Sequence, residues 1–506
     1  MRDALSQPLV LPCGATLPNR IAKAAMTEGV ADPWLRATAR HERLYRTWSK
    51  GGAGMLLTGN VQVDRTDLER PGNVAIDQSE PRTYSPEARA RLAAWAKAGT
   101  VAGNHLWTQI SHAGRQAPRY VTNRPSAPSA VQLDLLGNYA QPIALTEAQV
   151  LDLIGRFAHA ADVAREAGFT GVQVHGAHGY LISSFLSPIT NLRSDAWGGS
   201  LENRARFLME TIRAVRRAVG ADFPVAVKLN SDDFRKGGFS SDECLQVVRW
   251  LNDEALDLLE VSGGTYEQPR LIGFEGRAAD AVQVRPSTRV REAYFLDYAA
   301  AIRKVARMPM MVTGGFRSRA GMEDALTPSP ACGRGHEHRG ESHDARGEGL
   351  SGPSPDLRST SPASAGEVKA GPSPDLRSTS PATAGEVKRE GDCDVIGLGR
   401  PLCWQPDFPR RLLARETDAI ENLDARLRLR DRGWLSPASP YTAAKVLNAF
   451  GSQAWYYCQI FRLADGRPAD LNLGVLAALG EYLFDELRAA RRTHSAYRKG
   501  SGARAS

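Results

Sequence analysis

Long apolar runs are absent from this sequence of 506 residues, and that absence excludes one broad class of protein. No stretch approaches the ~20 consecutive apolar residues that a membrane-spanning helix needs, so we expect no membrane partner. The opening residues, MRDALSQPLVLPCG, also lack the basic start and long apolar core of a secretory signal peptide. Together these absences predict a soluble, cytoplasmic protein.

Cysteine is scarce, and no two cysteines stand in a C-x-x-C pair. Six cysteines scattered over so long a chain form neither a disulfide framework nor a zinc or iron–sulfur signature. We therefore expect reduced thiols and no metal. The six are Cys13, Cys244, Cys332, Cys393, Cys403 and Cys458.

Acidic residues are missing from the end of the chain. The formal net charge is +8, from 64 Lys and Arg against 56 Asp and Glu, an excess that also occurs in nucleic-acid-binding proteins. Much of this excess lies in residues 488–506, however, and a short basic tail is typical of a solvated terminus. We therefore expect no nucleic-acid partner. The basic residues of the tail are Arg488, Arg491, Arg492, Arg498, Lys499 and Arg504.

Residues 327–392 lack Phe, Tyr, Trp, Ile and Met altogether. Within them, the sequence of Gly352–Lys369 recurs at Gly371–Lys388 with one difference, Ser364 against Thr383. Two copies are too few for a solenoid. Each copy has only one Leu and one Val, and burying these two side chains cannot offset the entropy lost when the backbone is ordered. We predict that this segment is a disordered, low-complexity insertion. The near identity of the two copies indicates a recent in-frame insertion of repetitive DNA.

Elsewhere the chain repeats one pattern, a short apolar run followed by an amphipathic helix. Eight such units, with Gly or polar residues where each run ends, favour an α/β fold of the closed (β/α)8 TIM-barrel type. An open doubly wound sheet is the alternative, but the chain has no dinucleotide-binding glycine fingerprint. Predicted helices include Ala148–Ala167, Leu201–Val219 and Ala293–Val305. The predicted strands are Ile21–Met26, Met55–Val63, Leu106–Ile110, Gly171–Val174, Val225–Leu229, Leu256–Val261, Met310–Thr313 and Val395–Leu398.

These patterns divide the chain into three predicted parts. Residues 1–326 and 393–415 form the barrel domain. The disordered insertion 327–392 leaves it between the seventh helix and the eighth strand, on the face opposite the active-site rim. Residues 416–506 form a helical extension that ends in the basic tail, with two or three helices over Ala443–Arg492.

Two imidazoles and a phenol follow the fourth strand, in the sequence His175-Gly-Ala-His178-Gly-Tyr180. Catalytic side chains in such barrels stand where strands end, at the carboxyl rim. Neutral imidazoles that converge there would hold a carbonyl oxygen as it gains negative charge, and a nearby Tyr would deliver a proton. The H-x-x-H spacing is also half of a metal site, but no third ligand follows at a useful distance.

Glycines and a cation follow the last two strands. Gly314, Gly315 and Gly399 place backbone amides where these barrels commonly bind phosphate, and Arg400 adds a charged fork. A glycine pair also occurs in ordinary tight turns. The prediction of a phosphate site therefore depends on finding glycines at the ends of both adjacent strands.

Two polar side chains interrupt the apolar strands themselves. Lys228 ends the fifth strand, and a buried amine there needs an anionic partner, such as a reduced cofactor ring or a carboxylate. Gln109 ends the third strand with an amide that both donates and accepts hydrogen bonds.

Several motifs in the right order strongly resemble those of the Old Yellow Enzyme, or NADH:flavin oxidoreductase, family. The resemblance runs from about Gln7 to Leu413, interrupted only by the insertion. The motifs are Leu17-Pro-Asn-Arg-Ile-Ala-Lys-Ala-Ala-Met-Thr27, Gln109-Ile-Ser-His-Ala-Gly-Arg115, the His175–Tyr180 segment, and Asn191-Leu-Arg-Ser-Asp-Ala-Trp-Gly-Gly-Ser-Leu-Glu-Asn-Arg-Ala-Arg-Phe207.

The resemblance implies an FMN-binding barrel that takes hydride from NADH or NADPH and passes it through flavin N5 to the activated C=C of an α,β-unsaturated carbonyl compound. His175 and His178 would bind the substrate carbonyl, and Tyr180 would protonate the α-carbon. The implied FMN ligands are Ala25, Met26 and Thr27 beside the ring, Gly59 and Gln109 at its pyrimidine edge, Lys228 at N1 and O2, and Gly314, Gly315, Gly399 and Arg400 at the phosphate.

The chain departs from the family at two positions. Many members carry Pro in place of Ala25 and Arg in place of Lys228, and a Lys keeps the charge while losing the planar fork. Loops Tyr120–Gln141 and Gly264–Pro286 would select the substrate, and a homo-oligomer is compatible with the sequence. The alternatives are a dienoyl reductase-like enzyme, an amine or alcohol dehydrogenase on the same flavin barrel, a pseudoenzyme impaired by the insertion, and a barrel that binds a sugar phosphate.

Overall fold

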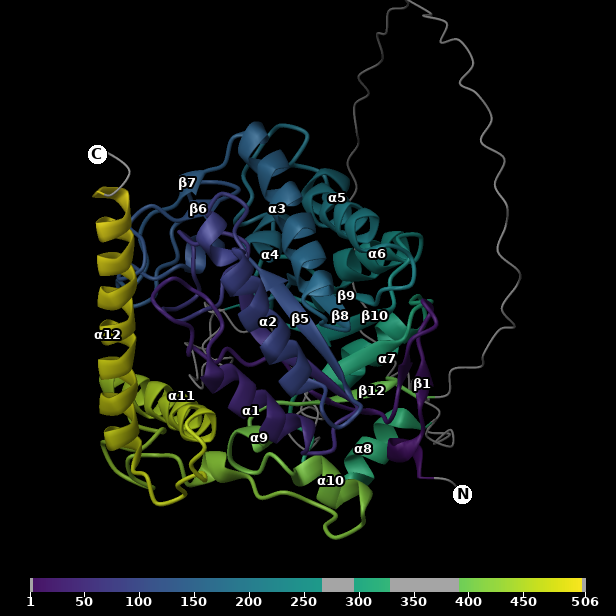
Figure 1. The fold of residues 1–506 in the computed structure, drawn as a ribbon, viewed down its shortest axis with the longest axis vertical. Coiled ribbons are helices and arrows are strands. Elements are labelled where there is room, and N and C mark those ends of the chain that lie inside the picture. Colours follow the sequence, from purple (N-terminus) through teal and green to yellow (C-terminus); the bar gives the residue numbers. More distant parts are fainter. Residues whose placement is uncertain (1–2, 266–294, 328–390, 503–506) are drawn as a thin grey trace, which may run out of the picture. The chain divides into compact units, whose positions relative to one another are not determined.

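Eight parallel strands close into a barrel at the centre of the fold (Figure 1). The computed structural model describes residues 3–265, 295–327 and 391–502. The strand order is β10-β11-β12-β3-β4-β5-β8-β9, and the ring closes because β9 pairs with β10. The predicted (β/α)8 barrel is confirmed, and the open-sheet alternative is excluded. The barrel strands are β3 (Ile21–Lys23), β4 (Met55–Gln62), β5 (His105–Ser111), β8 (Gly171–Gly176), β9 (Val225–Asn230), β10 (Leu258–Ser262), β11 (Met310–Thr313) and β12 (Val395–Leu398).

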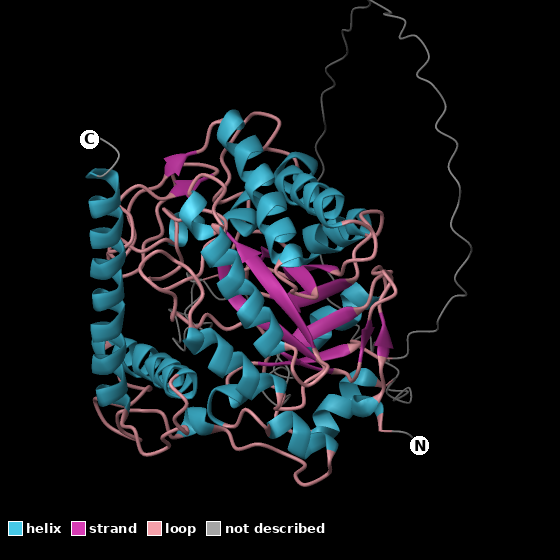
Figure 2. Cartoon of the chain, viewed as in Figure 1, coloured by secondary structure: helices cyan, strands magenta, loops and turns pink. Residues whose placement is uncertain are grey.

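Helices alternate with the strands and surround the barrel (Figure 2). Polar side chains cap their N-termini: the Thr146 hydroxyl accepts from Gln149 N, and the Ser240 hydroxyl accepts from Glu243 N, which satisfies amides that lack an intrahelical partner. The helices are α1 (Ala39–Ser49), α2 (Pro86–Gly99), α3 (Glu147–Glu166), α4 (Leu181–Leu186), α5 (Leu201–Val219), α6 (Ser241–Leu251), α7 (Leu296–Arg303), α8 (Arg319–Leu326), α9 (Pro401–Trp404) and α10 (Phe408–Leu413).

Alternate residues of each strand face the barrel interior and the helix layer. Met55, Trp107 and Leu258 belong to an inner cluster, whereas Leu56 and Leu106 pack with the helices in the larger outer core. The Trp107 ring needs a neighbour without a side chain, because a Cβ at Gly171 would lie 2.5 Å from Trp107 Cδ1. Because both faces are buried, the strands appear in the sequence as continuous apolar runs.

A small hairpin closes the N-terminal end of the barrel. Strands β1 (Leu9–Val10) and β2 (Thr16–Leu17) pair antiparallel, and Leu9, Leu11 and Leu17 belong to the same cluster as the inward-facing strand residues. The hairpin fills this end with apolar side chains, so the polar chemistry is confined to the opposite, carboxyl-terminal rim.

The two ends of the predicted insertion meet beside α8. A Cβ at Gly391 would lie 2.4 Å from the carbonyl carbon of Leu326, and the Cys393 amide donates to Ala325 O at 3.1 Å. The predicted disorder of 327–392 falls almost entirely outside the described residues. The junction lies where the chain enters β12, at the N-terminal end of the barrel, as expected for an αβ loop.

Two long helices follow the barrel, α11 (Thr442–Ala464) and α12 (Val475–Gly502), so α12 runs ten residues beyond the predicted end at Arg492. No helix in the described ranges is both long enough and apolar enough to cross a membrane. The predicted domain boundaries remain predictions. The smaller elements are η1 (Ala4–Ser6), η2 (Pro81–Thr83), η3 (Gly114–Gln116), β6 (Ser126–Ala127), β7 (Ile143–Ala144) and η5 (Leu423–Ala425).

Candidate active site

The structure brings the predicted histidines and tyrosine together at the carboxyl end of β8. The His175 ring centroid lies 5.2 Å from that of His178 and 4.7 Å from that of Tyr180, with both ring pairs nearly perpendicular. Tyr180 is the N-cap residue of α4, and only 3% of its surface is exposed. One strand end and the first turn of the next helix therefore place two imidazoles and one phenol side by side.

His175 is held as a neutral hydrogen-bond donor. Its Nδ1 accepts from the Ala177 amide at 3.2 Å, so in the neutral ring the proton resides on Nε2. Burial, reinforced by the neighbouring His178 and Lys228 side chains, holds the pKa of His175 well below its usual 6.5. The ring therefore presents an N–H, without a net charge, at neutral pH.

His178 is positioned by the ends of strands β9 and β10 and by η3. Its backbone is in the left-handed region, with φ +64°, and its amide donates to Asn230 Oδ1 at 3.0 Å. Its Nε2 lies 2.6 Å from Ser262 Oγ, and Gln116 Nε2 donates to its carbonyl oxygen at 3.0 Å. Burial and the nearby Lys228 ammonium hold its pKa well below 6.5, so this ring is also neutral at pH 7.

A buried ion pair crosses the mouth of the barrel. Lys228 Nζ lies 3.0 Å from Glu260 Oε1, on strands whose register places these two residues opposite each other. Only 5% of Lys228 and none of Glu260 is exposed. The same carboxylate accepts hydrogen bonds from Thr313 Oγ1 at 2.7 Å and from Gln173 Nε2 at 2.8 Å. The Glu260 carboxylate thus has three polar partners, which offset the free energy that it costs to remove its charge from water.

Gln109 extends this network to a fifth strand. Its Nε2 donates to Gln173 Oε1 at 2.6 Å, and its backbone amide donates to Thr58 Oγ1 at 2.9 Å. Glutamine, glutamate, lysine and threonine side chains from β5, β8, β9, β10 and β11 therefore form one hydrogen-bonded polar layer inside the rim.

The end of β3 lies against β4. A Cβ at Gly59 would lie 2.5 Å from Thr27 Cα and 2.6 Å from Met26 O, so only glycine permits this approach. The Thr27 hydroxyl donates to Glu69 Oε2 at 2.6 Å, and Asn60 Nδ2 donates to the same oxygen at 2.6 Å. The structure thus brings Met26 and Thr27 against Gly59 at the rim, and their contact with a flavin ring stays a prediction.

The ends of β11 and β12 leave backbone donors free. Gly314 and Gly315 have φ values of +128° and +81°, and within the described chain neither Gly315 N nor Arg400 N donates a hydrogen bond. The Arg400 side chain is half exposed and pairs with Asp424, at 2.7 Å. Asp424 also pairs with Arg317, at 3.2 Å, which brings a second guanidinium to this end of the site.

These features fit FMN. Free amides at two adjacent strand ends, with Gly399 beside them, suit a phosphate, which binds preferentially to convergent backbone N–H groups. A Cβ at Gly399 would meet nothing nearer than Met26 Sδ, at 3.9 Å. At the other end of the site, the buried Lys228 ammonium and the Gln109 amide suit the polar edge of a flavin ring.

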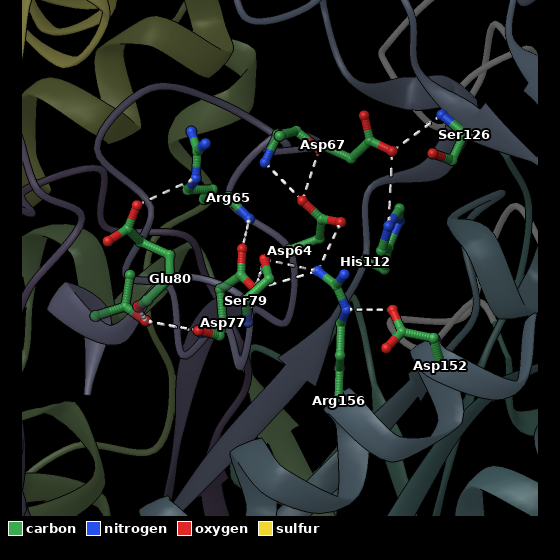
Figure 3. A network of polar contacts seen from close by, with 12 residues as sticks. Asp64, Arg65, Asp67, Asp77, Ser79, Glu80, His112, Ser126, Asp152 and Arg156 are labelled. Carbon is green, nitrogen blue, oxygen red and sulfur yellow. Dashed lines mark hydrogen bonds and ion pairs between the residues drawn. The ribbon is translucent and has the colours of Figure 1, made fainter. Parts of the chain in front are cut away.

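The loop that carries Glu69 is braced by a polar network between helix and loops (Figure 3). Arg156 of α3 pairs with Asp64 and Asp77, each at 3.1 Å, and with Asp152 at 2.7 Å. Next along the loop, Asp67 Oδ2 accepts from Ser126 N at 2.9 Å.

Asp67 itself is fully buried, and burial raises its pKa to about 6 although His112 Nε2 lies 3.6 Å away. These contacts therefore hold the loop of residues 64–77 against the barrel.

The sequence did not predict three residues that the structure places in or beside the site. Glu260 had a usable signal, since it is the lone acid in the apolar run Leu258-Leu-Glu-Val-Ser262. Glu69 and Asp424 had none, because Glu69 lies in a loop and Asp424 in the short η5 turn, and their partners are remote in sequence. In the described ranges, no group of three His, Cys, Asp or Glu side chains is placed to hold a metal ion.

Comparison with known proteins assigns the chain to a family. The sequence pattern of the NADH:flavin oxidoreductase / NADH oxidase family matches residues 5–332. The NADH-dependent flavin oxidoreductase iliE of Hypocrea jecorina (strain QM6a) is 36% identical over 343 residues, which are 65% of this chain and 83% of that protein. The protein of the same name from Neonectria sp. (strain DH2) is 36% identical over 342 residues, but the chain spans only 44% of its length.

A solved structure shows the same fold. The old yellow enzyme homologue from Zymomonas mobilis superposes with a TM-score of 0.57 at 21% identity, covering 83% of this chain and 95% of that one. The predicted cofactors, FMN with NADH or NADPH as the reductant, are those of this group of proteins. Fold and sequence agree, and the chain belongs to the NADH:flavin oxidoreductase / NADH oxidase family, which is the Old Yellow Enzyme family.

Proposed function

We propose that this protein reduces the activated C=C bond of α,β-unsaturated carbonyl compounds at the expense of NADH or NADPH. The observation that supports this proposal is the contact of two neutral imidazoles with one phenol at the rim. When bound, FMN supplies the redox chemistry, by carrying hydride between the nicotinamide and the substrate. We further propose that Lys228, Gln109 and Thr27 contact its ring, and that Gly314, Gly315, Gly399 and Arg400 contact its phosphate.

His175 and His178 bind and polarise the substrate carbonyl in this proposal. An enone that accepts hydride at its β-carbon gathers negative charge on its oxygen. His175 offers a preorganised Nε2–H to that oxygen, and the neighbouring ring of His178 is fixed by Asn230 and Ser262. Donors that are already in place cost no reorganisation when the charge develops.

Tyr180 delivers the proton that completes the reduction. Its ring contacts His175, so its hydroxyl serves the same substrate from a neighbouring position. A proton donor is needed for C=C reduction but has no evident role in oxidation of an amine or an alcohol. This distinguishes the proposed reaction from the dehydrogenase alternatives on the same barrel.

The two half-reactions test the proposal separately. We expect Tyr180→Phe to leave the rate of flavin reduction by NADPH within twofold of the wild-type rate. Reoxidation of the reduced enzyme by cyclohexenone should slow by about 100-fold, since general acid catalysis typically contributes 10²- to 10⁴-fold. Anaerobic stopped-flow absorbance near the flavin band measures both rates.

Tyr84→Phe is the matched control, because it removes a phenol hydroxyl that donates to Gln78 O on the surface, at 3.2 Å. It should change neither half-reaction. An unslowed reoxidation in Tyr180→Phe would remove the tyrosine from the reaction. Flavin reduction by an amine without nicotinamide would support the dehydrogenase alternative instead.

A further inference from the structure

A basic groove lies between the loop after β5 and the last turns of α12. Its volume is about 850 Å³. Four arginines and one histidine line it, together with small polar and apolar residues, and none of its described lining residues is acidic. The five basic residues are Arg119 and Arg124 from the loop, and Arg491, His494 and Arg498 from the helix.

The two walls of the groove are tied to each other. The His494 ring Nε2 lies 3.1 Å from Tyr120 O, which joins helix to loop directly. The Tyr120 hydroxyl donates to Glu486 Oε2 at 3.3 Å, and Arg70 Nε donates to Glu486 Oε1 at 2.9 Å. Because Arg70 and Glu486 are both buried, this anchor is rigid, and the groove exists before any ligand arrives.

The nearest acid along α12, Glu486, does not line the groove. Glu486 is engaged by Arg70, and no ion pair is formed by Arg119, Arg124 or Arg491 within the described part of the chain. Like charges gathered around one concave surface raise the local potential, which an anion lowers. The groove therefore favours a ligand with several negative charges.

The groove lies close to the substrate-binding end of the site. Gln116, whose Nε2 donates to His178 O at 3.0 Å, precedes Arg119 by three residues. Three residues span at most about 10 Å of chain. A ligand whose reactive end lies beside His178 would thus reach the groove with an extended tail.

We infer that this groove binds the phosphate groups in the nucleotide half of the nicotinamide dinucleotide, and that it selects the 2′-phosphorylated form. The inference rests on the proposed function for the identity of the reductant. It goes beyond the family, because α12 lies outside the residues 5–332 that match the family pattern. The names of the NADH-dependent relatives therefore do not predict it.

Calorimetry on the FMN-loaded full chain tests the inference without turnover. The two probes are ADP-ribose and its 2′-phosphorylated counterpart. We expect the phosphorylated probe to bind at least tenfold more tightly at low salt, and less so as salt screens the charges. Replacing Arg124 and Arg491 by Gln should weaken its binding roughly three- to tenfold, as expected for two exposed ion pairs, and should weaken ADP-ribose, which lacks the 2′-phosphate, by less.

Arg492→Gln is the matched control, because Arg492 is an exposed arginine on the same helix that does not line the groove. Equal binding of the two probes by the wild type, or an equal loss in Arg492→Gln, would overturn the inference. Tight binding of coenzyme A but not of phosphorylated ADP-ribose would also overturn it, and would assign the groove to a substrate tail. Binding of single-stranded RNA to the groove in place of both would assign it to nucleic acid and overturn it as well.

The outcomes separate this inference from the proposed function. An enzyme that reduces cyclohexenone with NADH and NADPH equally well, and shows no preference between the probes, retains the proposed function and loses the groove assignment. A protein that binds phosphorylated ADP-ribose through Arg124 and Arg491 but reduces no enone retains the phosphate site and loses the proposed reaction.

Discussion

Lys228 shares its positive charge with Glu260, and this pairing sets the electrostatics of the rim. The two groups are 3.0 Å apart and almost completely buried, so solvent screens their interaction little. A lysine alone would strongly favour negative charge on a bound flavin ring. The neighbouring carboxylate offsets part of that effect.

Glu260→Gln should raise the reduction potential of bound FMN. Gln keeps hydrogen bonds to Thr313 and Gln173 but leaves the ammonium charge of Lys228 unbalanced, which stabilises the anionic reduced flavin. We expect an increase of about 30 mV, equivalent to ~1.4 kcal/mol for a two-electron couple. Spectroelectrochemical titration measures the potential.

Glu254→Gln is the control for this change, since it removes a carboxylate that pairs with Arg213 at the surface. Its potential should equal that of the wild type. A lowered or unchanged potential in Glu260→Gln would contradict the role given to the pair.

Enone binding should be independent of pH between about 6 and 8. Both imidazoles have pKa values held well below 6.5, so they stay neutral and titrate only under more acidic conditions. Because the unfolded chain takes up these protons at higher pH than the folded one, stability is full above pH 6.5 and falls as the pH falls below it. Cyclohexenone titrations across this pH range measure the dissociation constant, and an inflection near pH 6.5 would contradict neutral imidazoles.

At the residue scale, the sequence predicted the polar side chains of the rim better than it predicted the residues that pair with them. The spacing of His175, His178 and Tyr180 was sufficient to predict their contact, because one strand end and one turn position all three. Lys228 was predicted to need an anion, but its choice of Glu260 depends on the register of β9 against β10. Such pairing is a property of the closed sheet, which local sequence does not encode.

At the scale of elements, α11 and α12 hold the loop between β4 and α2. The Arg70 guanidinium of that loop pairs with Glu486 of α12 and lies 4.1 Å from the Tyr457 ring centroid and 5.0 Å from that of Tyr482. Its neighbour Glu69 accepts from Thr27 at the rim. The C-terminal helices therefore support, through one loop, the edge of the rim where we propose that the flavin ring binds.

Glu486→Ala should lower the free energy of unfolding by about 3 kcal/mol, because it leaves the Arg70 charge buried without a counterion. Urea denaturation measures the loss. Arg70→Met combined with Glu486→Leu should recover most of it, since apolar side chains need no counterion. Glu481→Ala, an exposed acid on the same helix, is the control and should change stability by less than about 0.5 kcal/mol. A double variant no more stable than Glu486→Ala would contradict the buried-pair account.

Element boundaries were predicted well where sequence carries end signals. β11, β12 and α5 match the predicted ranges, because apolar runs or a Ser200 cap and Gly220 stop delimit them. β3 ends at Lys23 although the predicted strand continues to Met26: Ala24 N still donates to Leu398 O of β12, at 2.9 Å, and the chain leaves the ladder after it. Helix α12 exceeds its predicted end because its basic last turns pack against Tyr120 and Trp34.

At the scale of the whole molecule, the barrel closes without the low-complexity segment. Its flanks meet where Gly391 contacts Leu326, so the chain leaves and returns at one point. This point lies at the end of the barrel that the β1–β2 hairpin fills, opposite the rim.

Replacing residues 328–390 by a short Gly-Ser linker should therefore leave FMN content unchanged. A shorter loop costs less closure entropy, so we expect the free energy of unfolding to rise by up to about 2 kcal/mol. Flavin absorbance per polypeptide and urea denaturation check the two outcomes. Loss of flavin in the shortened chain would show that the segment supports β12 and the phosphate end.

The most direct test of the central claim is the visible spectrum of the purified protein, followed by anaerobic titration with NADPH and then with cyclohexenone. A flavin enzyme of the proposed kind is yellow as purified, bleaches with the nicotinamide, and regains its colour with the enone. A folded, colourless protein that takes up no added FMN would contradict the account.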